Sequence, residues 1–238
     1  MTVWERERAV CAFLDQLPRD WGAIVIGGYA VNAWTIPRYS EDLDLVFPAG
    51  VEEEVVGSFA SHPWSREREW TGEGDVAGAF RFTRRLGEDV DLTVDLLFGS
   101  VMDRAFRVPV AYEVLRARTV ETPIPCVETA TRNPITVANP VALCLLKCQP
   151  MRPTDKDDIT GLLLLDGWDR EELHALCRDL LPPDPLVRNL DGLLAFIRED
   201  RTIRLIRRRF PQFGPDDLLR RRRGLVADVS RWIQATQA

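Results

Sequence analysis

The sequence predicts an α/β (α+β) protein, in which a mixed β-sheet with flanking helices is followed by a region of helices alone. Up to residue 138, short apolar runs and apolar–acidic alternation, both typical of strands, are interspersed with segments of helical spacing. From residue 139 onward, apolar residues recur at helical spacing and prolines separate the segments. The composition, with 45% apolar and 29% charged residues, is that of a globular protein.

The first elements alternate between helix and strand. Apolar residues at helical spacing predict a helix over residues 4–17, which Pro18 ends. The run Ile-Val-Ile at 24–26 predicts a short buried strand that leads directly into Gly-Gly at 27–28. A helix is expected to resume over residues 29–34.

Alternation of apolar and acidic residues identifies the next strands. Residues 42–47 and 90–98 follow this pattern, so each strand has one apolar and one acidic face. Between them, residues 51–60 have helical spacing and an acidic first turn that suits the helix dipole. Shorter elements are a strand at 80–84, a helix at 112–116 and a strand at 135–137.

Proline marks the helix boundaries of the second part. Asn139 is expected to cap a helix that has Pro140 at its first position and runs through Lys147. Later breaks are expected at residues 150–153, 182–183 and 211–215. The chain is therefore divided into residues 1–138 and 139–238.

Charge is distributed unevenly. The net charge is −6, yet the last 43 residues contain 11 arginines and five acidic residues. This Arg-rich C-terminal region suits RNA phosphates, which arginine binds through a fork of donors. Arginines on solvated helices that pair with acidic residues are the alternative. Because no window of about 18 apolar residues occurs and residues 1–8 lack a secretory pattern, we expect a cytoplasmic protein without a membrane span.

Two aspartates form the centre of a candidate metal site. Asp42 and Asp44 project from one face of their strand, and their mutual repulsion is unfavourable unless a cation joins them. Asp95, on the strand 90–98, is expected to add a third carboxylate. Mg²⁺ prefers carboxylate oxygens and keeps coordination positions open for phosphate. The three aspartates therefore predict a magnesium site.

The diglycine at 27–28 precedes these aspartates at a strand-to-helix turn. Glycine lets the backbone approach a ligand closely, and the helix that follows offers backbone amides to phosphate. A phosphate cradle beside paired carboxylates predicts metal-assisted nucleotidyl transfer. Taken singly, however, a Gly-Gly turn is common, and acidic–apolar alternation is typical of any strand with one wet face.

Two stretches resemble a known superfamily. Residues 25–31 (VIGGYAV) and 38–45 (RYSEDLDL) are similar to the signature of polymerase-β-type nucleotidyltransferases, and Val94-Asp95-Leu96 matches its third carboxylate. The resemblance implies a nucleotidyltransferase catalytic domain over residues 1–138 and a helical domain over 139–238 that completes the nucleotide site. It also implies that Asp42 and Asp44 bind metal, and that Asp95 binds metal or assists deprotonation of the acceptor.

A second resemblance points to one branch of this superfamily. Residues 140–147 (PVALCLLK) and 152–159 (RPTDKDDI) are similar to the AbiEii/MenT-like toxin nucleotidyltransferases, although Thr154 stands where that branch has lysine. Gly28 likewise stands where many members have serine. Whether Asp155, Asp157 or Asp158 is the functional acid of this stretch stays open.

This branch implies roles for the other candidates. Gly27 and Gly28 hold the triphosphate of an NTP, Lys147 neutralises it, and Asp158 positions the nucleotide or the lysine. Further candidates for nucleotide binding are Arg38, Ser40 and Arg152. The chain has only two lysines, which favours a function for Lys147; a lysine that extends to solvent from a helix end is the alternative.

The function expected from these residues is Mg²⁺-dependent transfer of a nucleoside monophosphate from an NTP to an acceptor hydroxyl, with two Mg²⁺ ions and release of pyrophosphate. The branch implies an RNA acceptor such as a tRNA 3′ end, a toxin role and a cognate antitoxin protein. One alternative is a small-molecule nucleotidyltransferase of the antibiotic-inactivating type. The other is a non-catalytic module that binds nucleotide or a partner.

Overall fold

A computed structural model of the chain describes residues 3–60, 63–70, 78–88, 90–103 and 106–237. The chain divides into two compact units, each with its own core. The sheet unit comprises Met1–Ala33, Pro37–Val101 and Pro109–Asn139, and the helical unit comprises Trp34–Ile36, Met102–Val108 and Pro140–Ala238. None of the described helices is long and apolar enough to cross a bilayer.

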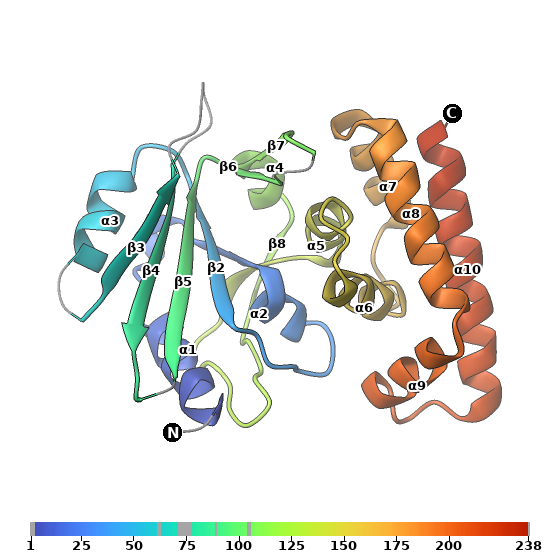
Figure 1. Ribbon diagram of the computed structural model, residues 1–238, viewed down its shortest axis with the longest axis horizontal. Coiled ribbons are helices and arrows are strands. Elements are labelled where there is room, and N and C mark those ends of the chain that lie inside the picture. The colour runs from blue at the N-terminus through green and yellow to red at the C-terminus, as the bar shows by residue number, and fades with distance from the viewer. Residues whose placement is uncertain (1–2, 61–62, 71–77, 89, 104–105, 238) are drawn as a thin grey trace. The chain divides into compact units, whose positions relative to one another are not determined.

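The sheet unit is built on a mixed sheet (Figure 1). Within the described residues, seven strands lie in the order β3-β4-β5-β2-β1-β9-β8. Their bounds are β1 Ile24–Ile26, β2 Asp42–Phe47, β3 Ser65–Trp70, β4 Ala79–Arg85, β5 Asp91–Phe98, β8 Thr119–Thr122 and β9 Ile135–Ala138. The pairs β2–β5 and β1–β9 are parallel, and the other neighbours are antiparallel. The predicted fold class, a mixed sheet with flanking helices followed by a helical region, is confirmed.

One face of the sheet carries the core of this unit. On β2 and β5 the residues alternate, so that Leu43 and Val94 are fully buried while the aspartates face the other side. The helices α1 (Val3–Gln16) and α3 (Glu52–Ala60) cover the apolar face. The ring of Phe59 on α3 lies 5.1 Å from that of Phe82 on β4. The opposite face of β2 and β5 is thereby left for polar side chains.

Smaller elements complete the sheet unit and its connections. The helix α2 (Gly27–Asn32) follows β1 without a loop, so it begins at the first glycine and not near residue 29 as expected. The other elements are β6 (Ser100–Met102), β7 (Pro109–Ala111) and α4 (Tyr112–Arg116). The strand β3, rich in charged residues, was not expected from the sequence.

The helical unit consists of helices that mostly begin at a proline. Their bounds are α5 Pro140–Lys147, α6 Pro153–Leu163, α7 Arg170–Leu180, α8 Pro183–Arg198, α9 Asp200–Arg209 and α10 Pro215–Gln237. Proline suits the first helical position because its missing N–H has no intrahelical partner there. The long α10 packs against α7 and α8, and its fully buried Trp232 stacks on His174 of α7 at 5.8 Å. The sequence did not reveal two further breaks, between α6 and α7 and at Glu199.

Candidate active site

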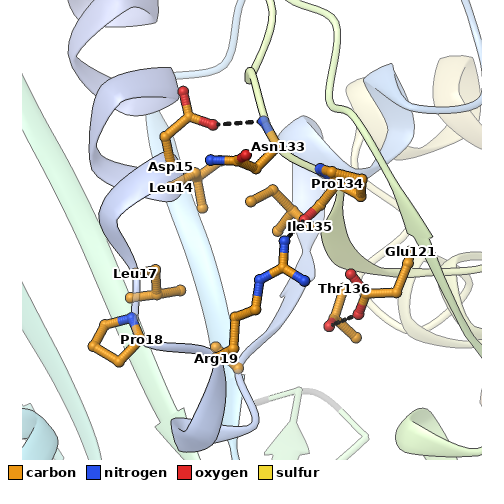
Figure 2. A pocket seen from close by; sticks show the side chains of 11 residues that line it. Leu14, Asp15, Leu17, Pro18, Arg19, Glu121, Asn133, Pro134, Ile135 and Thr136 are labelled. Carbon is orange, nitrogen blue, oxygen red and sulfur yellow. Dashed lines mark hydrogen bonds between the residues drawn. The ribbon is translucent and has the colours of Figure 1, made fainter.

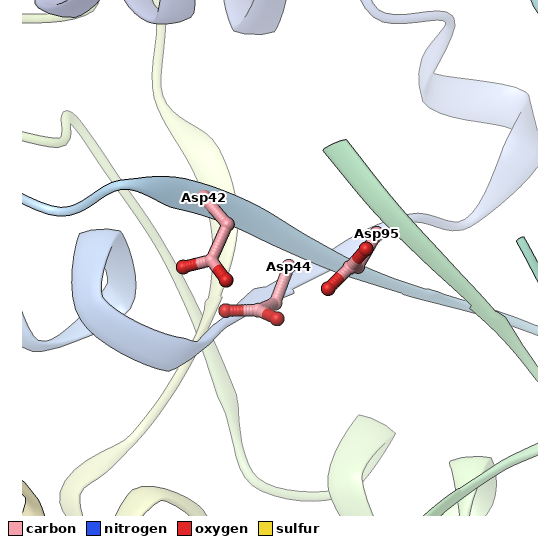
Figure 3. Close-up of side chains that lie close together, drawn as sticks. All are labelled: Asp42, Asp44 and Asp95. Atoms are coloured by element: carbon pink, nitrogen blue, oxygen red, sulfur yellow. The ribbon is translucent and has the colours of Figure 1, made fainter. Parts of the chain in front are cut away.

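Three carboxylates gather on the polar face of the sheet. The parallel register pairs Asp44 of β2 directly with Asp95 of β5, and Asp42 lies two residues earlier on β2. One carboxylate oxygen from each of the three lies within 4.8 Å of the others. Figure 3 shows the two β2 side chains extending from the same side of the strand, with Asp95 beside them. Hard oxygen donors at this separation, all partly exposed, fit a divalent cation such as Mg²⁺.

The turn between β1 and α2 lies against this cluster. Gly27 has a left-handed φ of 68°, and a Cβ built on it would lie 1.9 Å from Oδ2 of Asp44. A side chain there would therefore be strained and would also displace the carboxylate. Glycine at this position lets the backbone lie directly against the carboxylate of Asp44.

The next glycine accommodates two other candidate residues. A Cβ on Gly28 would lie 2.3 Å from Oγ of Ser40 and 3.3 Å from Nη2 of Arg38. The structure thus brings Arg38 and Ser40 onto the diglycine turn, in the same unit as the three aspartates. Burial raises the pKa of Tyr29, whose hydroxyl donates to the carbonyl of Ser40 at 3.4 Å.

Asn32 is a positioning residue that the sequence did not reveal. Its side chain is fully buried at the end of α2. The Nδ2 of Asn32 donates to the carbonyl of Arg38 at 2.9 Å, and the backbone N–H of Arg38 donates back to Oδ1 at 3.0 Å. These two bonds fix the backbone that carries Arg38 and Ser40. The available signal was a single amide within the apolar run 29–34.

Arg81 of β4 was also missed, and it pairs with two carboxylates of the cluster. Its Nε and Nη2 donate to Oδ1 and Oδ2 of Asp95, both at 2.6 Å. Its Nη2 also lies 3.7 Å from Oδ2 of Asp42. The hydrogen bonds with Asp95 raise the pKa of Arg81, so it is a permanent cation. Alternation along 80–84 indicates which face Arg81 occupies, but only the β4–β5 register shows that it pairs with Asp95.

A second group of candidate residues forms a buried ion cluster in the helical unit. The Nζ of Lys147, at the end of α5, lies 2.9 Å from Oδ2 of Asp158 and 3.2 Å from Oδ1 of Asp155 on α6. The side chains of Lys147, Asp155 and Asp158 are 8%, 1% and 0% exposed. Arg152 donates from Nε to Oδ2 of Asp155 at 2.8 Å. Both Asp155 and Asp158 therefore contact the lysine, and its buried side chain excludes the alternative of a lysine that extends to solvent.

The arginines of the C-terminal region fall into two classes. Some are engaged within the helical unit: Arg222 donates to the carbonyls of Ile197 and Arg198, and Arg231 pairs with Asp228. Others are exposed on α9, and in the part of the chain that the structure describes they form no ion pair: Arg204, Arg207 and Arg208. Their spacing places them on one side of the helix.

Two hollows of the sheet unit do not involve the candidate residues. The first, between the end of α1 and β9, has a volume of about 50 Å³ and is crossed by Arg19, which donates to the carbonyl of Pro134 (Figure 2). It has room for one or two water molecules and is too small for a nucleotide. The second, about 580 Å³, is lined by aromatic residues that include Phe13 and Trp64 on the core side of the sheet.

Solved structures are similar to this chain at low identity, whereas no protein-family model and no curated protein matches its sequence. JHP933 from Helicobacter pylori is 14% identical, covers 99% of this chain and 93% of that one, and has a TM-score of 0.47. MenT4, a nucleotidyltransferase toxin from Mycobacterium tuberculosis H37Rv, is 11% identical, covers 90% and 79%, and has a TM-score of 0.38. ANT(2")-Ia in complex with adenylyl-2"-tobramycin is 16% identical, covers 79% and 93%, and has a TM-score of 0.34.

Proposed function

We propose that this chain is a metal-dependent nucleotidyltransferase that transfers a nucleoside monophosphate from an NTP to a hydroxyl of RNA. The observation that carries the proposal is the gathering of Asp42, Asp44 and Asp95 within 4.8 Å, directly against the Gly27 backbone. The sequence resemblance to polymerase-β-type enzymes involves these same residues. A toxin role with a cognate antitoxin is part of the proposal and rests on the AbiEii/MenT-like motifs alone.

Different residues of the chain would have different roles in this reaction. The three aspartates hold the cation, which when bound supplies Lewis-acid charge to the phosphoryl group and the acceptor oxygen. The side-chain-free surface of Gly27 and Gly28 lets the triphosphate approach the backbone. Arg38, fixed by Asn32, contributes a fork of donors for phosphate oxygens.

A transfer assay tests the chemistry. The protein is incubated with Mg²⁺, radiolabelled NTPs and total tRNA, and label on RNA is measured. Asp42→Asn and Asp44→Asn should lower the rate at least about 100-fold, the cost of removing one preorganised electrostatic group. Asp91→Asn is the matched control, because Asp91 is exposed on the same strand as Asp95 and lies outside the cluster.

The outcomes separate the alternatives. Label on aminoglycosides or other small polyhydroxyl compounds but not on RNA would assign a small-molecule acceptor. Nucleotide binding without transfer to any acceptor would indicate a non-catalytic module. Equal rates for the wild type and Asp44→Asn would exclude the carboxylate cluster as the catalytic centre.

The exposed α9 arginines support RNA as the acceptor, because guanidinium groups on one helix side that form no ion pair with any described residue suit a phosphate backbone. Replacing Arg204, Arg207 and Arg208 by glutamine should weaken the binding of RNA whatever the RNA sequence. It should also reduce the slope of log K against log salt by about 2, since each phosphate contact contributes about 0.7–0.9. The control is Arg220→Gln with Arg231→Gln, which removes arginines already paired with Asp217 and Asp228. An unchanged slope in the triple variant would exclude this surface.

A further inference from the structure

Arg81 occupies the position where a cation is expected to bind. Its Nη2 is 2.6 Å from Oδ2 of Asp95 and 3.7 Å from Oδ2 of Asp42, which are two of the three candidate metal ligands. The contact with Asp95 uses both carboxylate oxygens, with Nε on one and Nη2 on the other. The guanidinium therefore already satisfies the carboxylate that β5 contributes to the cluster.

A guanidinium and a divalent ion make incompatible demands on Asp95. Mg²⁺ binds carboxylate oxygens at about 2.1 Å, so an ion shared by Asp42 and Asp95 would lie within a few ångströms of Arg81. Like charges at that range repel, and the side chain of Asp95 is only 16% exposed, which limits screening by water. For the ion to enter, the two-pronged contact has to loosen.

The sheet holds Arg81 in this position. Arg81 and Asp95 are direct cross-strand partners in the antiparallel β4–β5 register, so their side chains leave neighbouring backbones on the same face. Arg84 is a matched control for Arg81 on the other face of the sheet. It lies on the same strand but faces the opposite way, is exposed, and lines the hollow on the core side of the sheet.

We propose that Arg81 competes with the divalent ion for Asp95, so that the site binds the free ion weakly and takes up ion and nucleotide together. This inference rests on the metal site of the proposed function. A guanidinium released from Asp95 has donors available for an anion, and a triphosphate supplies one. The nucleotide therefore offsets the loss of the Arg81–Asp95 contact, which couples the two binding events.

Metal binding without turnover tests the proposal. Free Mn²⁺ is titrated by electron paramagnetic resonance into the wild type and into Arg81→Met, Arg81→Lys and Arg84→Met, with and without a non-hydrolysable NTP analogue. Arg81→Met should bind Mn²⁺ alone at least about tenfold more tightly than the wild type. Arg81→Lys, which keeps the charge but loses the fork of donors, should fall between them. Arg84→Met should match the wild type within about twofold, because it removes the same charge on the opposite face.

A double-mutant cycle with Asp95→Asn separates competition from general electrostatics. Without the Asp95 carboxylate, adding Arg81→Met should raise Mn²⁺ affinity several-fold less than it does in the Asp95 background, because only charge repulsion and the longer contact with Asp42 then remain. In the Asp95 background, the analogue should raise Mn²⁺ affinity several-fold more in the wild type than in Arg81→Met. Circular dichroism verifies folding, and Arg81→Lys remains informative if Arg81→Met does not fold.

The proposal is overturned if Arg81→Met binds Mn²⁺ as weakly as, or more weakly than, the wild type. In that case Arg81 only orients Asp95. Because no acceptor or product is involved, the result is independent of the transfer assay. If Arg81→Met leaves Mn²⁺ affinity unchanged and the wild type transfers nucleotide normally, the competition by Arg81 is refuted and the proposed function stands. If Arg81→Met binds Mn²⁺ more tightly but the wild type shows no transfer, the competition stands and the proposed function is refuted.

Discussion

Replacing Lys147 by methionine removes the ammonium from the buried cluster of the helical unit while keeping an unbranched side chain. In the native protein Nζ lies 2.9 Å from Asp158 and 3.2 Å from Asp155. Asp155 retains Arg152 at 2.8 Å after the change. Asp158, whose side chain is 0% exposed, loses its lysine, so the cost of the substitution falls mainly on this carboxylate.

The expected loss is large because the charges are desolvated. Removing one partner of a buried ion pair costs about 3–5 kcal/mol, whereas breaking an exposed pair costs less than about 1 kcal/mol. Against a typical total of about 5–15 kcal/mol, this is a major fraction of the stability. With a urea dependence of roughly 2–3 kcal/mol per molar, the midpoint of unfolding should fall by about 1–2 M.

Urea unfolding followed by circular dichroism measures the loss, and hydrogen exchange of α5 and α6 localises it to the helical unit. The control is Arg201→Met, which removes a cation paired with Glu199 at an exposed site, where the side chains are 61% and 48% accessible. Adding Asp158→Asn to Lys147→Met should recover more than half of the loss, because it neutralises a buried carboxylate that has lost the charge of the lysine. Equal unfolding midpoints for Lys147→Met and Arg201→Met would refute the reasoning. Lys147 would then serve nucleotide binding and would not stabilise the helical unit.

Three further predictions concern Gly27, Gly28 and the protonation of His174. Gly27→Ala should lower Mn²⁺ affinity at least about tenfold, since its Cβ would lie 1.9 Å from a cluster carboxylate, whereas Gly57→Ala, which meets open space, should be neutral. Gly28→Ala should weaken binding of the NTP analogue, and adding Ser40→Gly should restore the fold around the turn, because the clash is with Oγ at 2.3 Å. Burial lowers the pKa of His174 below its ordinary value, so the unfolded chain binds the proton first. The stability contributed by neutral His174 should therefore be lost as pH falls from about 6.5 toward the folded pKa. Urea titrations at pH 7.5 and pH 5 measure this loss of stability in the wild type. The loss should be absent in His174→Gln, which has no imidazole to protonate.

The carboxylate cluster could be predicted from the sequence because its geometry follows from a period of two. Asp42 and Asp44 share a face in any strand, and both predicted strands were found. That Asp95 joins them depends on the parallel β2–β5 register, which pairs it with Asp44. The strand pattern of residues 90–98 offered Asp95 as a third carboxylate and the family resemblance matched it, but neither determined the register that brings it to Asp44.

Cross-strand and tertiary partners could not be predicted in the same way. Arg81 pairs with Asp95 through a register between strands that no local pattern determines. The choice among the aspartates of α6 was left open, and helix geometry then brought two of them to Lys147, since residues 155 and 158 lie on one side of a turn. Between the breaks expected at residues 182–183 and 211–215, the chain was expected to continue as one helix. It breaks at Glu199, where no proline or glycine marks the end.

The strand that the sequence did not reveal has a consequence for the behaviour of the protein in concentrated solution. β3 is an outer strand of the sheet, and its sequence, Ser-Arg-Glu-Arg-Glu-Trp, lacks the apolar alternation by which strands are recognised. Its pairing with β4 is also irregular between Arg66 and Arg68. Charges and a bulge on an outer strand discourage a second chain from adding to the sheet by backbone hydrogen bonds. The feature that hides β3 from pattern recognition therefore also protects the protein from self-association and aggregation at this edge.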